Sequence, residues 1–320
     1  MTKTNQQKVK DFLINNGVII VMFILVIYTG FTSDNFFTKN NFMNILMNMS
    51  SRLVIALGIA GCVITAGCDL SAGRMIGFGA CISGMLLQRM DYSGKFFPDM
   101  QPLNVFVVAL IAMLVCAAFG TVTGFFIAYL NVPPFIATLA MMEIVYGIGL
   151  IVTNATPLGG YVEQYTNVSN GKFLGINYLI WIAIIVAAIT WFIFNMTRHG
   201  KYMYAIGGNP QAAEVAGVPV KATLILIYMK AAAMYGLAGF MLGAKAGGAS
   251  VQTGYGYEME AIAACTIGGV SVTGGRGKVS SAIIGVAVFE LLKVALQYLG
   301  MNANAQYIAI GVVIFIAISL

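Results

Sequence analysis

Charged residues are scarce in this chain of 320 residues: Asp, Glu, Lys and Arg make up 9% of it, and hydrophobic residues make up 59%. A soluble domain carries about 25% charged and about 45–50% apolar residues. The chain therefore lacks the polar surface of a soluble fold, which excludes a secreted domain, a nucleic-acid-binding protein and a cytosolic enzyme. Its net charge of +6 indicates membrane topology and contact with anionic lipid rather than nucleic acid.

Metal ligands and catalytic motifs are scarce as well. The only histidine is His199, and the five cysteines form no CxxC pair and lie in or beside apolar stretches: Cys62, Cys68, Cys81, Cys116 and Cys265. We expect no metal site, no catalytic site and inert, buried thiols. The run from Gly274 to Ser280 looks like a phosphate-binding loop, but valine occupies both position 272 and the position after Lys278, where a Walker A motif needs Gly and Ser or Thr. We therefore expect no nucleotide or other cofactor in this chain.

Long apolar runs are what the sequence has in abundance. Runs of about 15–25 residues match the ~30 Å hydrocarbon core of a bilayer, so they predict an all-α, polytopic membrane protein with about ten transmembrane helices. The expected spans are 18–31, 46–66, 75–90, 105–130, 135–152, 176–196, 223–243, 261–272, 280–299 and 305–320. Because the eighth is short and the third and ninth are rich in glycine, we expect some of these helices to be broken.

The sequence also supports a prediction at each end of the chain. The first apolar run follows a polar segment without a small-residue cleavage site, which predicts a transmembrane helix rather than a removable signal peptide. The last run is apolar as far as Leu320, and we expect the natural chain to continue into a basic cytoplasmic end.

Lysine and arginine predict the orientation, because they are enriched on the cytoplasmic side of membrane proteins. With a cytoplasmic N-terminus, nine fall on the inner side: Lys3, Lys8, Lys10, Arg74, Arg198, Lys201, Lys221, Arg276 and Lys278. Five fall on the outer side: Lys39, Arg89, Lys95, Lys172 and Lys245. The reverse orientation has the smaller number inside, so the sequence favours a cytoplasmic N-terminus.

Two polar intervals interrupt the apolar runs. Residues 154–175 are expected to form an outer loop, and residues 197–221 an inner one. In the inner interval Asn209 is a good N-cap, Pro210 fits the first helical position, and Gly217 and Pro219 are typical of a helix end. This pattern predicts a two-turn helix outside the membrane over 210–216, narrow enough to enter a partner's cleft. An ordinary connecting loop is the alternative.

Two segments, 67–74 and 269–276, share a pattern at an offset of 202 residues: glycines near both ends, a hydroxyl at Ser71 and Thr273, and a final arginine. Helix breaks persist at membrane depth only where they line a cavity or contact protein, and paired breaks mark the pathway of many transporters. The match is compatible with a two-half internal repeat of parallel orientation. Asp69 is costly in apolar surroundings unless paired, and Arg74 is its expected partner.

These residues resemble a known family. The stretches GCDLSAG, YAIGGNPQAAEVAGVPV and IGGVSVTGGRGKVSSAIIG look like the permease subunits of bacterial sugar ABC importers of the ribose, xylose and galactose group, in the family's order and over the whole chain. The family pattern often has Ile and Val where this chain has Cys68 and Ala72. Carried onto this chain, the family motifs fall on Asp69, Leu70, Ser71, Gly73, Gly269, Gly274 and Gly275.

The resemblance implies a single transmembrane permease domain, 1–320, in the bacterial cytoplasmic membrane. It implies a second permease copy, an ATPase subunit whose two nucleotide-binding domains hold ATP and Mg, and a periplasmic sugar-binding protein. The implied substrate is a monosaccharide, galactose or a methyl galactoside. The implied contacts with the ATPase are Gly207, Asn209, Ala212, Ala213, Glu214 and Gly217.

Substrate contacts are a separate question. A neutral sugar needs hydrogen-bonding groups and aromatic faces, and the candidates are Asn44, Asn48, Asn131 and Tyr146, each of which also fits a helix-packing or capping role. Two other functions stay open. One is an ion-coupled secondary sugar transporter with Asp69, Glu143 or Glu290 as the ion-coupling site. Sugar uptake that needs no ATP and collapses with an uncoupler would indicate this carrier. The other is a membrane enzyme, for which the chain offers few reactive groups.

Overall fold

The computed structural model describes residues 17–319, and almost all of its regular structure is helical. The helices are α2 (Gly17–Thr32), α3 (Lys39–Ile64), α4 (Ala72–Leu86), α5 (Val105–Tyr129), α6 (Pro134–Thr153), α7 (Glu163–Asn170), α8 (Tyr178–Met196), α9 (Arg198–Gly208), α10 (Pro210–Val215), α11 (Val220–Ala246), α12 (Tyr257–Ile267), α13 (Val279–Tyr298) and α14 (Ala303–Ser319). The expected all-α class is confirmed. Lys3, Lys8, Lys10 and Leu320 lie outside the described residues.

Each predicted apolar run falls on a helix, but the helices differ in length. Six of them, α3, α5, α6, α8, α11 and α13, are long and apolar enough to cross a membrane, and α2, α4 and α14 include shorter apolar helices. The eighth run forms α12, which has 11 residues. The chain is therefore a multi-pass membrane protein with at least six clear spans in the described part, and the number ten depends on how the short helices are counted.

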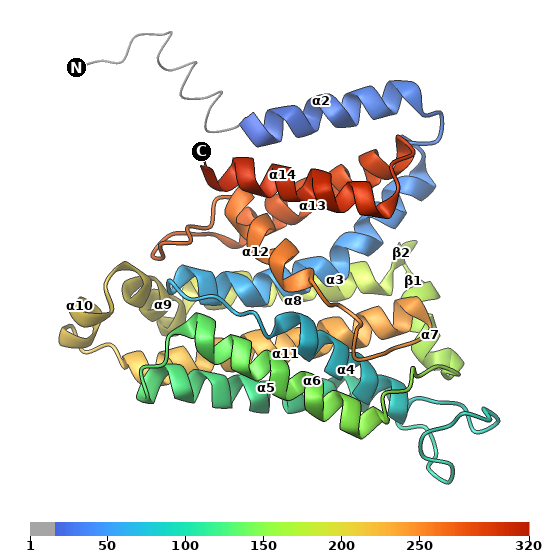
Figure 1. Cartoon of the computed structure of the whole chain (residues 1–320), viewed down its shortest axis with the longest axis horizontal. Coiled ribbons are helices and arrows are strands. Elements are labelled where there is room, and N and C mark those ends of the chain that lie inside the picture. The colour runs from blue at the N-terminus through green and yellow to red at the C-terminus, as the bar shows by residue number, and fades with distance from the viewer. Residues whose placement is uncertain (1–16, 320) are drawn as a thin grey trace.

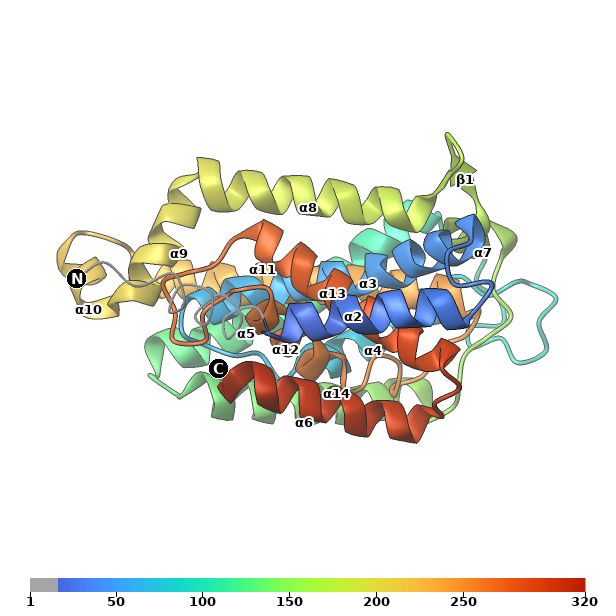
Figure 2. The ribbon, with the colours of Figure 1, turned by 90° about the horizontal axis from the view of Figure 1, so that it is seen from above.

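Helix α3 lies at the centre of the bundle, and the other long helices run roughly along the same axis (Figures 1 and 2). Every residue of α3 from Leu53 to Ile64 is buried, as expected for a helix that is apolar on all sides. The outer helices α5 and α8 instead expose large apolar side chains such as Phe106 and Ile185, which suits contact with lipid. Burial thus separates a central helix from a lipid-facing ring.

Small residues set the closest helix contacts. A Cβ added at Gly120 of α5 would overlap the carbonyl oxygen of Tyr228 on α11, and one at Gly124 would lie 2.7 Å from Cα of Ile225. The Gly120–Gly124 pair therefore brings α5 against α11 within this chain, as small-xxx-small pairs do in membranes.

The interval 154–175 is not the plain loop that the sequence predicted. It contains α7, and its end forms the hairpin of β1 (Lys172–Phe173) with β2 (Ile176–Asn177). Leu174 and Gly175 have φ of 52° and 79°, the left-handed pair that a two-residue type I′ turn requires. Leucine is unusual at such a turn position, so the sequence did not indicate a hairpin here. This hairpin and α7 lie at one end of the molecule, and α9 and α10 lie at the other (Figure 1).

Candidate functional site

The helix is interrupted between α3 and α4, over residues 65–71, as the first glycine-flanked motif predicted. Asp69 lies there with 1% of its surface exposed, and its Oδ1 accepts hydrogen bonds from the backbone nitrogen of Ser71 at 3.0 Å and from its hydroxyl at 2.5 Å. The prediction that Arg74 pairs with Asp69 is wrong. Arg74 Nη1 donates instead to Gln252 Oε1 at 2.8 Å and to the carbonyl of Val251 at 3.3 Å. Asp69 and Arg74 are close in sequence, but Arg74 lies on the first turn of α4 and faces a different segment, so the two side chains do not pair.

This geometry predicts which of two substitutions at Asp69 destabilises the protein more. Asp69→Asn keeps an oxygen that accepts from Ser71, whereas Asp69→Ala leaves two buried donors without it, a loss of about 1–3 kcal/mol per orphaned group. We expect Asp69→Ala to give less folded permease and a lower midpoint of thermal unfolding in detergent than Asp69→Asn. Equal midpoints for the two variants would contradict the assigned role of Ser71.

A second non-helical segment, residues 247–256 between α11 and α12, consists mainly of turns. A Cβ at Gly77 of α4 would lie 2.8 Å from the carbonyl oxygen of Val251, so this segment lies directly against α4. The sequence predicted an outer loop here, between the expected spans 223–243 and 261–272. The glycines of this segment are the signal for its turns: Gly247, Gly254 and Gly256 all have φ between 65° and 85°.

Both short helices begin beside these segments. At ~1.5 Å per residue, the 15 residues of α4 and the 11 of α12 reach about 22 Å and about 16 Å, less than a ~30 Å hydrocarbon core. Gly73 on α4 lies so close to Glu258 on α12 that a Cβ there would overlap the carboxylate. The structure therefore joins two incomplete helices at their N-terminal turns, an arrangement that transporters use inside the membrane.

Arg74 secures one side of this junction. Its guanidinium carbon lies 3.9 Å from the ring centroid of Tyr146 on α6 and 4.3 Å from that of Tyr255, just before α12. Gln252 Nε2 donates to the hydroxyl of Tyr146 at 3.2 Å. Tyr146, predicted as a sugar contact, thus belongs to a cation–π cluster that ties α4, α6 and the start of α12 together.

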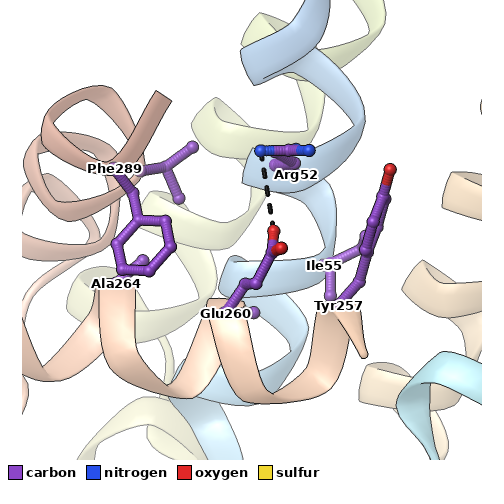
Figure 3. Close-up of a pocket in the computed structure, with 8 residues that line it drawn as sticks. Arg52, Ile55, Tyr257, Glu260, Ala264 and Phe289 are labelled. Carbon is purple, nitrogen blue, oxygen red and sulfur yellow. Dashed lines mark ion pairs between the residues drawn. The ribbon is translucent and has the colours of Figure 1, made fainter. Parts of the chain in front are cut away.

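Arg52 of α3 secures the other side. Its Nη1 lies 2.7 Å from Glu290 Oε2 on α13 and 3.5 Å from Glu260 Oε2 on α12, and its guanidinium carbon lies 5.0 Å from the ring centroid of Tyr257. Figure 3 shows Arg52 directed at Glu260, with Tyr257 on the same helix beside it. Lys293 of α13 also pairs with Glu260. We name Arg52, Glu260, Glu290 and Lys293 the ion-pair network; it binds α12 and α13 to the central helix.

A polar cavity of about 530 Å³ lies between α3, α11 and α13. We name it the amide cavity after its polar lining residues: Asn41, Asn44, Asn48, Lys245, Gln297 and Tyr298. A second cavity of about 220 Å³ shares Asn48 and Gln297 with it and reaches Arg52, Glu290 and Lys293. The amide cavity therefore leads toward the ion-pair network.

The four predicted substrate contacts do not come together. Asn44 and Asn48 both line the amide cavity, as their spacing on one helix face suggested. Tyr146 lies in the Arg74 cluster. Asn131 is exposed in the turn between α5 and α6, with φ of 52°. Sequence alone gave no indication of Lys245 or Gln297 as further lining residues, since they come from other helices.

The helix predicted over 210–216 exists as α10. Asn209 Oδ1 accepts from the backbone nitrogen of Ala212 at 2.9 Å, which confirms the predicted N-cap, and Gly217 ends the helix with φ of 84°. Val215 on this helix is 91% exposed. A single exposed apolar side chain is common on protein surfaces, so the notable feature here is the capped helix itself.

Two of the six predicted ATPase contacts are buried within the chain. Ala213 is 4% exposed, and Gly207 is buried because a Cβ there would overlap the carbonyl oxygen of Ile64 and lie 2.5 Å from the nitrogen of Gly275. The side chain of Ala213 and the backbone of Gly207 thus pack within the chain. Asn209, Ala212, Glu214 and Gly217 are exposed.

The second glycine motif packs at the same end of the bundle. Gly275 donates its backbone N–H to the carbonyl of Ile64 at 2.8 Å, and a Cβ at Gly274 would lie 2.6 Å from the carbonyl oxygen of Gly207. Gly269 opens this segment with φ of 98°. The second motif therefore connects the end of α3 with α9. In the first motif, Leu70 is buried at 7% exposure.

His199 lies in the first turn of α9, outside the long apolar helices. Burial, together with the charge of Lys230, lowers the pKa of His199 to about 4. The imidazole is therefore neutral at physiological pH.

A multi-pass helical bundle with interrupted helices at a buried, charged junction and a capped helix at one end defines a membrane transport permease. Residues 41–318 match the family model described as "Branched-chain amino acid transport system / permease component". The match covers most of the chain, which belongs to this permease family. The resemblance drawn from its motifs is thus confirmed at the level of the family.

Relatives match over nearly their full length. The chain is 39% identical to the galactose/methyl galactoside import permease protein MglC of Escherichia coli (strain K12) and 40% identical to that of Haemophilus influenzae, covering 100% of this chain and 97% of each relative. It is 32% identical to the ribose import permease protein RbsC of Escherichia coli (strain K12), over 97% of this chain and 94% of that protein. No solved structure matches the chain.

Proposed function

We propose that this chain is the transmembrane subunit of an ATP-driven importer that passes a monosaccharide, galactose or a methyl galactoside, inward across the bacterial cytoplasmic membrane. The observation that carries the proposal is α10, a capped helix outside the long apolar spans with Val215 projecting from it. A self-sufficient carrier has no use for such a contact helix. The sugar follows from the relatives that match over full length, although the family description names amino acids.

The proposal includes partners that this chain lacks. An ATPase subunit with two nucleotide-binding domains holds ATP and Mg and receives α10, and a periplasmic sugar-binding protein delivers substrate to the opposite end. A second copy of the chain pairs along the face where α14 and α6 lie on either side of α12 and α4 (Figure 1). Exposed Tyr255, just before α12, and exposed Met259, in its first turn, support that pairing. The distribution of lysine and arginine supports a cytoplasmic N-terminus, with α9 and α10 on the inner side.

The contact role of α10 predicts the effect of changing its exposed residues. Ala212→Trp adds bulk and Val215→Glu adds charge on the exposed surface, so each is expected to abolish transport and weaken co-purification of the ATPase while permease abundance stays near wild type. Ala213→Trp is unsuitable because Ala213 is buried. The measurement is a pull-down from membranes with permease quantified in the same samples.

Gln164→Glu is the matched control for ATPase co-purification, since it adds the same charge at an exposed position on α7, at the opposite end of the molecule. Full ATPase binding and uptake in both α10 variants would show that this helix only connects two spans and does not contact the ATPase. In the same vesicles, galactose uptake that needs ATP and survives an uncoupler supports the importer. Uptake that needs no ATP and collapses with the uncoupler indicates the ion-coupled carrier instead.

A further inference from the structure

Lys230 on α11 is a cation without a partner in a membrane span. Its side chain is partly buried, and within residues 17–319 it forms no ion pair and no hydrogen bond. A charge at membrane depth is costly unless an opposite charge or interfacial water meets it. We infer that Lys230 binds the phosphate of an anionic phospholipid, one of whose acyl chains lies in the apolar crevice beside it. This inference does not depend on the proposed transport function.

The crevice lies between α8 and α11, and α3 forms its floor. Helix α8 packs on α3 and α9 along one side of the bundle (Figure 2). The lining is mainly apolar, with Gly61 on the floor, Phe194 on α8 and Met234 on α11. A Cβ at Gly61 would meet nothing closer than 3.6 Å. The volume of about 30 Å³ fits a segment of a single acyl chain, while the rest of the lipid stays in the bilayer.

The polar groups of the crevice are few. Besides Lys230 they are Thr190 and His199. The hydroxyl of Thr190 already donates to the carbonyl of Val186 at 2.8 Å. Lys230 and His199 therefore remain for a ligand, and both are hydrogen-bond donors that a phosphate oxygen can accept from.

The depth of Lys230 suits a lipid headgroup. The 19 residues of α8 reach about 28 Å at ~1.5 Å per residue, which matches a ~30 Å hydrocarbon core, so Met196 at the end of α8 marks one boundary of the core. His199 lies three residues further, and the charge of Lys230 helps to lower its pKa, so the two side chains are neighbours. The crevice runs from there toward the bilayer centre, along Thr190 and Met234.

The surrounding charge favours an anionic lipid over a zwitterionic one. Arg198 and Lys201, both exposed in the first turn of α9, add positive charge at the same end. Basic pockets between transmembrane helices are typical sites for anionic headgroups. The surface of α8 beside the crevice exposes Ile189 and Phe192, as expected where lipid covers it. A soluble phosphate would leave the apolar crevice unused.

Lipid retention tests the site directly. The full chain is released for native mass spectrometry from nanodiscs of equal parts phosphatidylglycerol and phosphatidylcholine, and the wild type is expected to retain phosphatidylglycerol preferentially. Lys230→Met is expected to lower the ratio of phosphatidylglycerol-bound to lipid-free protein about fivefold, the ratio equivalent to the ~1 kcal/mol that one lysine contributes near anionic lipid. Lys230→Gln is expected to show the same loss, whereas Lys230→Arg keeps the charge and is expected to keep the lipid.

Lys221→Met is the matched control on the same helix. Lys221 is exposed, lies outside the crevice, and has its Nζ 5.2 Å from the ring centroid of Tyr129. This variant is expected to retain phosphatidylglycerol as the wild type does. Thermal unfolding in detergent gives a second measurement. Added phosphatidylglycerol is expected to raise the midpoint of the wild type more than that of Lys230→Met, and glycerol phosphate at equal concentration is expected to leave both unchanged.

The other outcomes overturn the inference. Equal retention by the wild type and Lys230→Met, or equal retention of the two lipids by the wild type, shows that Lys230 reaches interfacial water without a bound lipid. An equal loss in Lys221→Met shows a general attraction of the basic end for anionic lipid and no defined site. Stabilisation of the wild type by glycerol phosphate, as large as that by phosphatidylglycerol, shows a site for a soluble anion.

Discussion

Arg52→Leu is expected to destabilise the permease by about 3–5 kcal/mol, because removing one partner of a buried pair leaves the other charge uncompensated. Glu290 is only 3% exposed and loses the cation that lies 2.7 Å from it. Glu260 still pairs with Lys293 in this variant, so Glu290 is the carboxylate left without a cation. The measurement is the yield of monodisperse protein in detergent and its midpoint of thermal unfolding.

A double variant distinguishes a buried pair from simple loss of a side chain. Arg52→Leu combined with Glu290→Leu removes both charges, and we expect it to recover most of the stability, since apolar replacements of buried pairs are often neutral. Arg89→Leu is the surface control: Arg89 and Asp91 lie 3.5 Å apart with side chains 53% and 74% exposed, and such pairs contribute about 0–1 kcal/mol. A double variant no more stable than Arg52→Leu would refute the assigned pairing.

Gly207→Ala is expected to destabilise the end of the bundle that carries α9 by about 1–3 kcal/mol, the usual cost of overpacking. The added methyl group would overlap the carbonyl oxygen of Ile64, which already accepts from Gly275. Because the obstacle is backbone, neither side chain movement nor a rotamer change relieves it. Folded yield and thermal unfolding are the measurements.

The neighbouring glycine provides the control. Nothing lies within 4 Å of a Cβ at Gly208, so Gly208→Ala is expected to be neutral or slightly stabilising in α9. If Gly207→Ala unfolds at the same temperature as Gly208→Ala but loses ATPase binding, Gly207 is a partner contact after all and the packing role is wrong.

Several features followed from local sequence alone. Low charge and long apolar runs predicted a helical membrane protein, because burial in lipid depends on composition over one helix length. The N-cap at Asn209 and the end of α10 at Gly217 were predictable, since capping involves neighbouring residues only. The helix break around Asp69 was likewise indicated by its own glycines.

The site depended on contacts between distant segments, which no local pattern encodes. Arg52 meets Glu290 across 238 residues, and Arg74 meets Gln252 across 178. Sequence proximity suggested Arg74 for Asp69, yet helix direction turned the arginine toward another segment. The sequence therefore determined the class of protein, its helices and α10. Only the tertiary structure decided which charges pair, which glycines are buried and which amides share a cavity, because these properties arise where separate helices touch.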